Sequence, residues 1–135
     1  MIKLDLTSLH QALITLDEAV ECHSIEPDNT FIRDAMIQRF EYCYELTHKM
    51  LKRYLESTEP SREVIDHMSF PELIRTASER GLLLQGWDVW KQYRDARNIT
   101  SHTYNEQKAL QVCSIIPLFL KEAKYVASIL QNHGI

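Results

Sequence analysis

Apolar residues recur along much of this chain at the three- and four-residue steps that place them on one face of an α-helix. In the first such run the apolar positions are Leu6, Leu9, Leu13, Leu16 and Val20. The pattern predicts a helix from about Thr7 to Cys22. Pro27 then keeps Glu26 out of a helix, because the residue before a proline avoids helical backbone.

A second, longer helix is predicted from Phe31 to about Leu55, with Thr30 as its N-terminal cap. Its apolar side carries Ile32, Met36, Phe40, Cys43, Met50 and Tyr54. Its other side carries the charged residues Arg33, Asp34, Arg39, Glu41, Glu45, Lys49, Lys52 and Arg53. Such charged rows usually form a solvated or partner-facing surface. The segment Ser57–Ser61 is expected to be a loop.

A short third helix and an aromatic fourth helix follow. Ser69 and Glu72 have the S-x-x-E spacing of a capping box. Gly81 is suited to end the short helix, because glycine adopts left-handed backbone without strain. The segment GWDVWKQY predicts the fourth helix, whose two tryptophans suit core or dimer contacts better than base stacking.

The last helix is predicted from about Glu106 to Gln131. Its apolar heptad positions are Ala109, Cys113, Ile116, Leu120, Ala123, Ala127 and Leu130. Pro117 should bend this helix rather than end it, because the apolar repeat continues in register on both sides. The predicted fold is therefore all-α: one domain over residues 1–135, an antiparallel four-helix up-and-down bundle with one additional short helix.

Composition agrees with this fold and limits the kind of nucleic-acid contact. Only three glycines and four prolines occur in 135 residues, too few turn formers for a many-stranded protein. The formal net charge of −4 argues against a broad basic surface for nucleic acid. Any such contact is expected to be local or to form in an assembled cleft.

Cysteine usage and apolar run lengths predict a cytoplasmic protein with neither a metal nor another cofactor. Cys22, Cys43 and Cys113 are odd in number and far apart, which does not suit a disulfide framework or a zinc ribbon. Cys22–His23 has no second ligand pair at workable spacing. The N-terminus is polar too early for a signal peptide, and the longest apolar stretch, SIIPLFL, is too short to span a membrane.

The polar segment RDARNITSHTYN, from Arg94 to Asn105, interrupts the apolar pattern before the last helix. If helical spacing continues through it, one line along the helix contains Trp90, Arg94, Arg97, Ser101 and Tyr104. Asn98 and His102 then form a neighbouring row. Arginine and histidine are common at helix ends, where they interact with the last carbonyls. A guanidinium that grips phosphate and an imidazole that titrates near neutrality also suit phosphodiester chemistry.

Arg97 and His102 form the pattern R-x4-H, and Tyr104 extends it to R-x4-H-x-Y. Together with the segment FIRDAMIQRFEYCYELTHKMLKRYL and the helical layout, this pattern resembles HEPN domains, specifically the HepT-like toxins and their relatives, the nucleotidyltransferase substrate-binding proteins. The resemblance covers nearly the whole chain. It implies a homodimer that places two R-x4-H motifs in a shared cleft. Charged residues of the second helix border that cleft in the family, which here adds Arg39 and Glu41.

The resemblance also implies an activity and a partner. Many HepT-like toxins are metal-independent endoribonucleases, encoded beside a minimal nucleotidyltransferase that serves as antitoxin. That enzyme adds AMP units to the motif tyrosine, which here is Tyr104. An adenylylated Tyr104 would carry phosphate where the phosphate of RNA is expected to bind, in competition for Arg97.

The residue types fit metal-free RNA cleavage, which needs a base, an acid and positive charge beside the phosphate. His102 can be the base or the acid, and Arg97 can hold two non-bridging oxygens. Asn98, Arg94 and Ser101 are supporting candidates, with Asn98 able to orient the phosphate or the histidine. One motif supplies one imidazole, so a dimer would supply the second.

Two other functions fit the same residues. Arg97 and His102 can bind a phosphate without cleaving anything, in a non-catalytic subunit that binds nucleotide or substrate for a nucleotidyltransferase. The chain can also be a helical interaction domain whose polar site has decayed. RNA cleavage in chelator identifies the ribonuclease, whereas saturable nucleotide binding without turnover identifies the accessory subunit.

Overall fold

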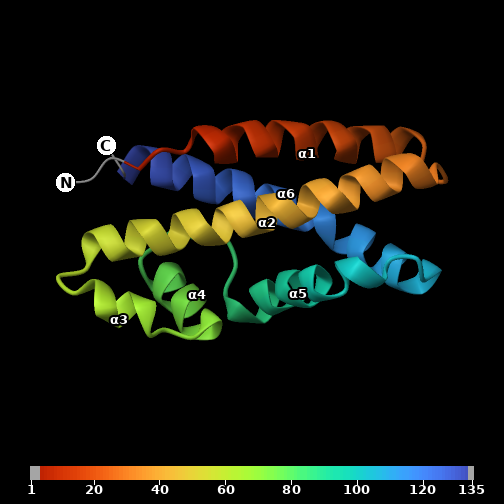
Figure 1. Ribbon diagram of the computed structural model, residues 1–135. Helices are drawn as coiled ribbons and strands as arrows, with labels where there is room; N and C mark the ends of the chain where they lie inside the picture. Colours follow the sequence, from red (N-terminus) through yellow and green to blue (C-terminus); the bar gives the residue numbers. More distant parts are fainter. Residues whose placement is uncertain (1–3, 134–135) are drawn as a thin grey trace.

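The computed structural model describes residues 4–133, and every regular element in that range is helical. In chain order these are α1 (Thr7–Ile25), α2 (Thr30–Thr58), α3 (Arg62–Asp66), α4 (Phe70–Glu79), α5 (Trp87–Asn98), the 3₁₀ helix η1 (Thr100–His102) and α6 (Glu106–His133). The four longest, α1, α2, α5 and α6, run antiparallel in succession (Figure 1). The predicted all-α, up-and-down bundle is confirmed.

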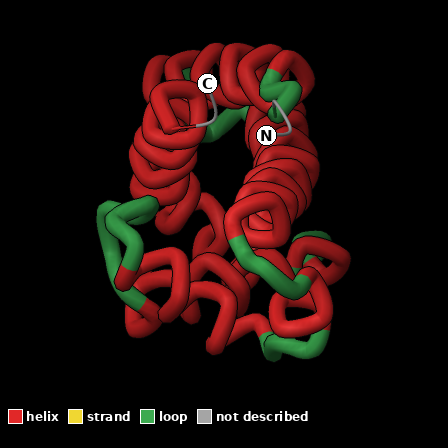
Figure 2. Tube along the Cα trace, turned by 90° about the vertical axis from the view of Figure 1, so that its left-hand side faces the viewer, coloured by secondary structure: helices red, strands yellow, loops and turns green. Residues whose placement is uncertain are grey.

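The short helices α3 and α4 lie on the same side of α2 as α5 (Figure 1). α1 packs on α2 and α6, while α5 packs on α6 and α4. Figure 1 shows α3, α4 and α5 below α2, and Figure 2 shows the short helices at the bottom of an end-on view. η1 contacts α2, α5 and α6. The polar segment after α5 therefore lies where three helices meet.

An aromatic cluster joins α2, α5 and α6 and holds α5 in place. Phe40, Trp90, Tyr93 and Phe119 are all buried. The ring centroids of Phe40 and Phe119 lie 5.2 Å apart, edge to face. Trp90 and Tyr93 form a second edge-to-face pair at 5.2 Å, the geometry that aromatic rings prefer. Trp90 is thus a core residue, and together with Tyr93 it packs α5 against Phe119 of α6.

Two helix ends in the first half of the chain differ from the sequence predictions. α1 ends one turn later than predicted, at Ile25. The predicted cap of α2, Thr30, is wrong, because the cap is Asn29. The Oδ1 atom of Asn29 accepts the backbone N–H groups of Phe31 and Ile32 at 3.0 and 3.2 Å. Asn29 has the extended backbone that a cap needs, whereas Thr30 is already helical.

The helix α3 was not predicted, and the loop expected at Ser57–Ser61 is shorter than expected. α2 continues to Thr58 before the chain turns. With five residues, α3 is too short to show a helical period in sequence. It is held instead by Ile65, which is buried in the core.

The short helix α4 begins as its sequence predicts, and Gly81 follows its end. The hydroxyl of Ser69 accepts the N–H of Glu72 at 3.3 Å, so the predicted N-cap is formed, while the Glu72 carboxylate accepts this hydroxyl at 3.0 Å rather than the backbone N–H of a full capping box. Gly81 has φ of 75°, in the left-handed region where glycine is favoured.

The last helix continues through Pro117 from Glu106 to His133, so the proline does not end it. The bend expected there stays a prediction. Although α6 contains the longest apolar run, no helix among residues 4–133 combines the length and hydropathy needed to cross a bilayer.

Candidate functional site

The polar segment does not continue the helical line of α5. α5 ends at Asn98, and three tight turns follow it. The backbone N–H of Ile99 donates a hydrogen bond to the carbonyl of Ala96. The N–H of His102 donates to the carbonyl of Ile99, and the N–H of Asn105 donates to the carbonyl of His102. The prediction that Ser101 and Tyr104 share a stripe with Arg97 is therefore wrong. The motif is instead divided between the last turn of α5 and the compact turn that leads into α6.

The guanidinium of Arg97 is held by groups from two other parts of the fold. Its Nε atom donates to Oε1 of Glu45 at 2.9 Å, and Nη1 lies 3.7 Å from Oε2 of Glu41. Nη1 also donates to the hydroxyl of Thr100 at 3.3 Å. Nη2 makes no hydrogen bond with residues 4–133, and the side chain is 32% exposed. Arg97 is thus oriented by the protein while one nitrogen stays open to a ligand.

Thr100 and Glu45 were not selected from the sequence as site residues. Thr100 is buried, and its hydroxyl donates to the carbonyl of Arg97 at 2.9 Å while accepting from the guanidinium. A threonine inside R-x4-H has no sequence signal for this role. Glu45 was grouped with the solvated charges of α2, and only the packing of α5 beside α2 brings it to Arg97.

His102 and Tyr104 lie on the turn with their rings open to solvent. Their ring centroids are 6.2 Å apart, and Tyr104 is 82% exposed. The imidazole of His102 makes no side-chain hydrogen bond with any residue in the range 4–133. Both groups are therefore accessible to a substrate or to a second protein.

The structure does not bring the supporting candidates to Arg97. The guanidinium of Arg94 lies over the ring of Trp87 at 4.9 Å, two helical turns earlier in α5. Asn98 and Ser101 are exposed. Neither makes a side-chain hydrogen bond within the described part of the chain. Their participation would require a ligand or a second chain.

Of the two α2 candidates for the cleft border, only Glu41 lies at the motif. Arg39 points to α1, where its Nη1 atom donates to the carbonyl of Thr15 at 2.7 Å and pairs with Glu18 at 3.2 Å. The two residues are two positions apart, so they project about 200° apart around the helix. Arg39 therefore links α1 to α2.

A cavity of about 280 Å³, here named the α2–turn cavity, opens between α2 and the motif turn. The residues that line it include Arg33, Asp34, Gln38, Glu41, Thr100 and Tyr104. Arg33 was expected on a solvated surface, but its side chain is only 13% exposed. Its guanidinium forms a 2.7 Å ion pair with Glu106 at the start of α6. The cavity thus adjoins the groups that hold Arg97.

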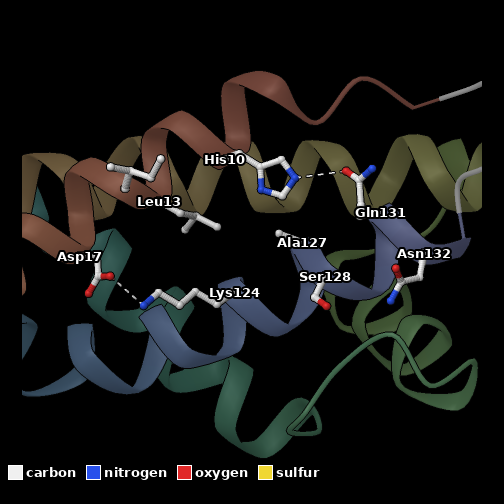
Figure 3. A pocket seen from close by; sticks show the side chains of 9 residues that line it. His10, Leu13, Asp17, Lys124, Ala127, Ser128, Gln131 and Asn132 are labelled. Atoms are coloured by element: carbon white, nitrogen blue, oxygen red, sulfur yellow. Dashed lines mark hydrogen bonds and ion pairs between the residues drawn. The ribbon is translucent and has the colours of Figure 1, made fainter.

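A larger cavity of about 440 Å³ lies between α1 and α6 and contains no motif residue (Figure 3). Two side-chain bridges cross it. His10 Nε2 lies 3.3 Å from Gln131 Oε1, and Lys124 Nζ donates to Asp17 at 2.9 Å. Leu13 and Ala127 lie between the bridges (Figure 3). These contacts hold α1 against α6 and place no catalytic group.

The cysteines do not form a reactive centre. Burial raises the pKa of the Cys43 thiol to about 12 and that of Cys113 to about 11. Both thiols therefore stay protonated at neutral pH. Cys22 is exposed. Among residues 4–133, no three His, Cys, Asp or Glu side chains gather in a metal-binding arrangement.

Comparison with known proteins shows relatives along nearly the whole chain. Residues 4–132 match the family described as nucleotidyltransferase substrate binding protein like. A Haemophilus influenzae protein named probable ribonuclease HepT is 34% identical over 140 residues, covering 98% of this chain and 95% of the relative.

Two solved structures are similar to the fold. One, from Haemophilus influenzae, is described as the fold of a substrate binding domain of a nucleotidyltransferase. It has a TM-score of 0.86 and 32% identity, and covers 94% of this chain and 99% of that one. The other, from Thermus thermophilus, has a TM-score of 0.74 and 32% identity, over 91% and 98% of the two chains.

Proposed function

Because this chain belongs to the nucleotidyltransferase substrate binding protein like family, we propose that it is a HEPN-type endoribonuclease that cleaves RNA without a metal. Arg97 and His102 are the proposed catalytic pair. The observation that carries this proposal is an exposed imidazole, five residues along the chain from a guanidinium that Glu45 and Thr100 hold. The name of the Haemophilus influenzae relative, probable ribonuclease, supports the same activity.

In the proposed reaction His102 takes the proton of the 2′-hydroxyl, and the 2′ oxygen attacks the adjacent phosphorus. The bond from phosphorus to the 5′ oxygen breaks, and an acid protonates that leaving oxygen. The products are a 2′,3′-cyclic phosphate and a 5′-hydroxyl. The open Nη2 of Arg97 donates to a non-bridging oxygen as negative charge grows there.

A homodimer would supply what one chain lacks. Each chain carries a single motif imidazole, so His102 of a second copy would be the acid that protonates the leaving oxygen. Two Arg97 side chains in one cleft would also offset the net charge of −4 per chain at the place where RNA binds.

Cleavage of RNA in the presence of a chelator tests this function. We expect the purified protein to cut single-stranded RNA in EDTA and to leave cyclic phosphate ends, detected by mass spectrometry of the fragments. The His102→Ala protein, purified in the same way, is the control for contaminating nucleases. Intact RNA after prolonged incubation at high protein concentration would count against the ribonuclease.

A partner nucleotidyltransferase is proposed as the antitoxin, acting on Tyr104. The solved Haemophilus influenzae relative is described as a substrate binding domain of such an enzyme, and Tyr104 is 82% exposed. An AMP adduct on Tyr104 would bring phosphate beside His102, whose ring lies 6.2 Å from the phenol ring. That phosphate would compete with RNA for Arg97.

After co-expression with its nucleotidyltransferase, we expect the chain to carry AMP on Tyr104. Peptide mass spectrometry should find a shift of one or more AMP units on the peptide containing Tyr104, and none in Tyr104→Phe. Tyr42, which is 37% exposed and hydrogen-bonded to Thr15, is the internal control. Modification on other residues with a clean Tyr104 peptide would reject the assignment.

The second candidate function is a subunit that binds nucleotide for a nucleotidyltransferase without cleaving RNA. The description of the solved Haemophilus influenzae relative favours it. In that case calorimetry should show saturable nucleotide binding that Arg97→Ala weakens, while RNA stays intact.

A further inference from the structure

The α2–turn cavity is connected to Arg97 through two shared residues. Glu41 and Thr100 line the cavity and also contact the guanidinium, at 3.7 and 3.3 Å. A group bound in the cavity therefore lies on the Nη1 side of the same guanidinium whose Nη2 atom we assign to the phosphate. In RNA, the sugar next to each phosphate carries a nucleobase, so a base is the group expected in a site beside a bound phosphate.

The groups left unengaged in the cavity are mostly hydrogen-bond acceptors. Arg33 is paired with Glu106 at 2.7 Å and lies 3.5 Å from Asp34, although its buried Nε atom makes no hydrogen bond within residues 4–133. The hydroxyl of Thr100 both donates and accepts within the fold. Besides that nitrogen, the cavity offers carboxylate oxygens of Asp34 and Glu41 and the amide of Gln38, which makes no hydrogen bond within residues 4–133.

The two carboxylates disfavour an anion in the cavity and favour a base with an amino group. Two carboxylates repel an anion but accept the N–H groups of an exocyclic amine. At the ring position where cytosine carries its exocyclic amine, uracil carries a carbonyl oxygen, which cannot donate to a carboxylate. The volume of about 280 Å³ is at the small end of ligand pockets, which suits one base rather than a whole nucleotide.

Tyr104 supplies an aromatic surface at the edge of this cavity. It lines the cavity, yet it is 82% exposed, so its ring is not used in packing the fold. Exposed aromatic rings stack on bases without regard to sequence. Tyr104 would therefore add affinity for any base. The carboxylates and the amide in the cavity would supply the preference for bases that carry an amino group.

We propose that the α2–turn cavity is a nucleobase subsite that prefers cytosine, adenine or guanine to uracil, with Tyr104 as its stacking surface and Asp34 and Gln38 as the selecting groups. The subsite deepens the proposed ribonuclease function and rests on it. It also gives the AMP adduct a second means of inhibition, because the adenine attached to Tyr104 would occupy the place of the substrate base.

Binding of matched RNA oligonucleotides to the His102→Ala protein tests the subsite without cleavage. Fluorescence anisotropy should show oligo-C bound about fivefold more tightly than oligo-U, since the two differ at the base edge that carries the amine. The double change Asp34→Ala and Gln38→Leu should remove this preference. Tyr104→Ala should weaken the binding of both RNAs by roughly 5- to 100-fold. Tyr104→Phe keeps the aromatic ring and should leave both affinities unchanged.

Gln11→Leu is the matched control, because Gln11 is an exposed glutamine on α1. It should leave both affinities and the preference unchanged. Equal binding of oligo-C and oligo-U, or a preference that survives the double change, would overturn the subsite and leave the ribonuclease standing. No binding of either RNA would contradict the subsite and the ribonuclease together.

Discussion

His102→Ala is expected to lower RNA cleavage by about 10²- to 10⁴-fold, the range that general acid–base groups contribute. The imidazole is exposed on the turn after α5 and makes no side-chain hydrogen bond within the described residues, so its removal leaves no buried group without a partner. Single-turnover cleavage of a fluorescent RNA measures the loss. Circular dichroism and the melting temperature should stay those of the parent protein.

Arg97→Ala should lower cleavage by a comparable factor, about 10²- to 10³-fold, because it removes the donor for the developing charge on phosphate. Arg97→Lys should recover little. A lysine ammonium cannot contact Glu45 and Thr100 and also donate to a phosphate with the fixed fork of arginine.

Two matched controls separate these effects from a general loss of histidine or positive charge. His67 at the end of α3 and Arg75 on α4 are exposed, and both helices lie away from the motif (Figure 1). Alanine at either position should leave cleavage unchanged. Full activity in His102→Ala or Arg97→Ala, with RNA still cut to cyclic phosphate ends, would remove these two residues from the mechanism.

Glu122→Ala is expected to cause a large loss of stability. Glu122 lies inside α6 and is 1% exposed, and its carboxylate accepts the backbone N–H groups of Leu84 and Gln85 at 2.7 and 2.9 Å. These amides belong to the segment between α4 and α5. Without the carboxylate, two backbone donors lose their partner, at about 1–3 kcal/mol each. Thermal unfolding should show a melting temperature lower by roughly 10 °C.

The pH dependence of stability gives an independent check on Glu122. Burial raises the pKa of its carboxyl, while the amides of Leu84 and Gln85 and the Trp90 side chain oppose the rise. The folded protein therefore holds this proton at a pH where the unfolded chain has lost it. The stabilisation is complete below the ordinary carboxyl pKa and is lost as pH rises through the raised pKa.

In Glu122→Gln this part of the pH dependence should be absent from denaturant unfolding curves collected between about pH 4 and pH 8. Glu79, an exposed glutamate at the end of α4, is the matched control. Alanine there should change the free energy of unfolding by no more than about 0.5 kcal/mol. A Glu122→Ala protein as stable as the parent would mean that the two amides find other acceptors.

The sequence by itself determined the elements that depend on neighbours along the chain. Helical spacing of apolar residues identified α1, α2 and α6, because periodicity is a property of each helix alone. The N-cap at Ser69 and the glycine at the end of α4 were also predicted from the sequence, because each depends on residues close by in the chain. The R-x4-H-x-Y motif was also visible, with the family to which the chain belongs.

Local rules failed where two candidates were adjacent or the element was short. Asn29 and Thr30 are both good caps, and the choice between them depends on where the backbone enters the helix. The end of α5 at Asn98 was missed because η1 packs against α2 and α6, which no spacing along the segment reveals.

Only the tertiary structure decided how the motif is held. Glu45 and Arg97 are 52 positions apart, and they meet only because α5 packs beside α2. Glu122 likewise meets Leu84 from 38 positions away. A salt bridge or a buried hydrogen bond depends on the distance between two groups in space. The sequence gives only their separation along the chain. The sequence therefore indicated the proposed reactive groups, and helix packing determined the partners that orient Arg97.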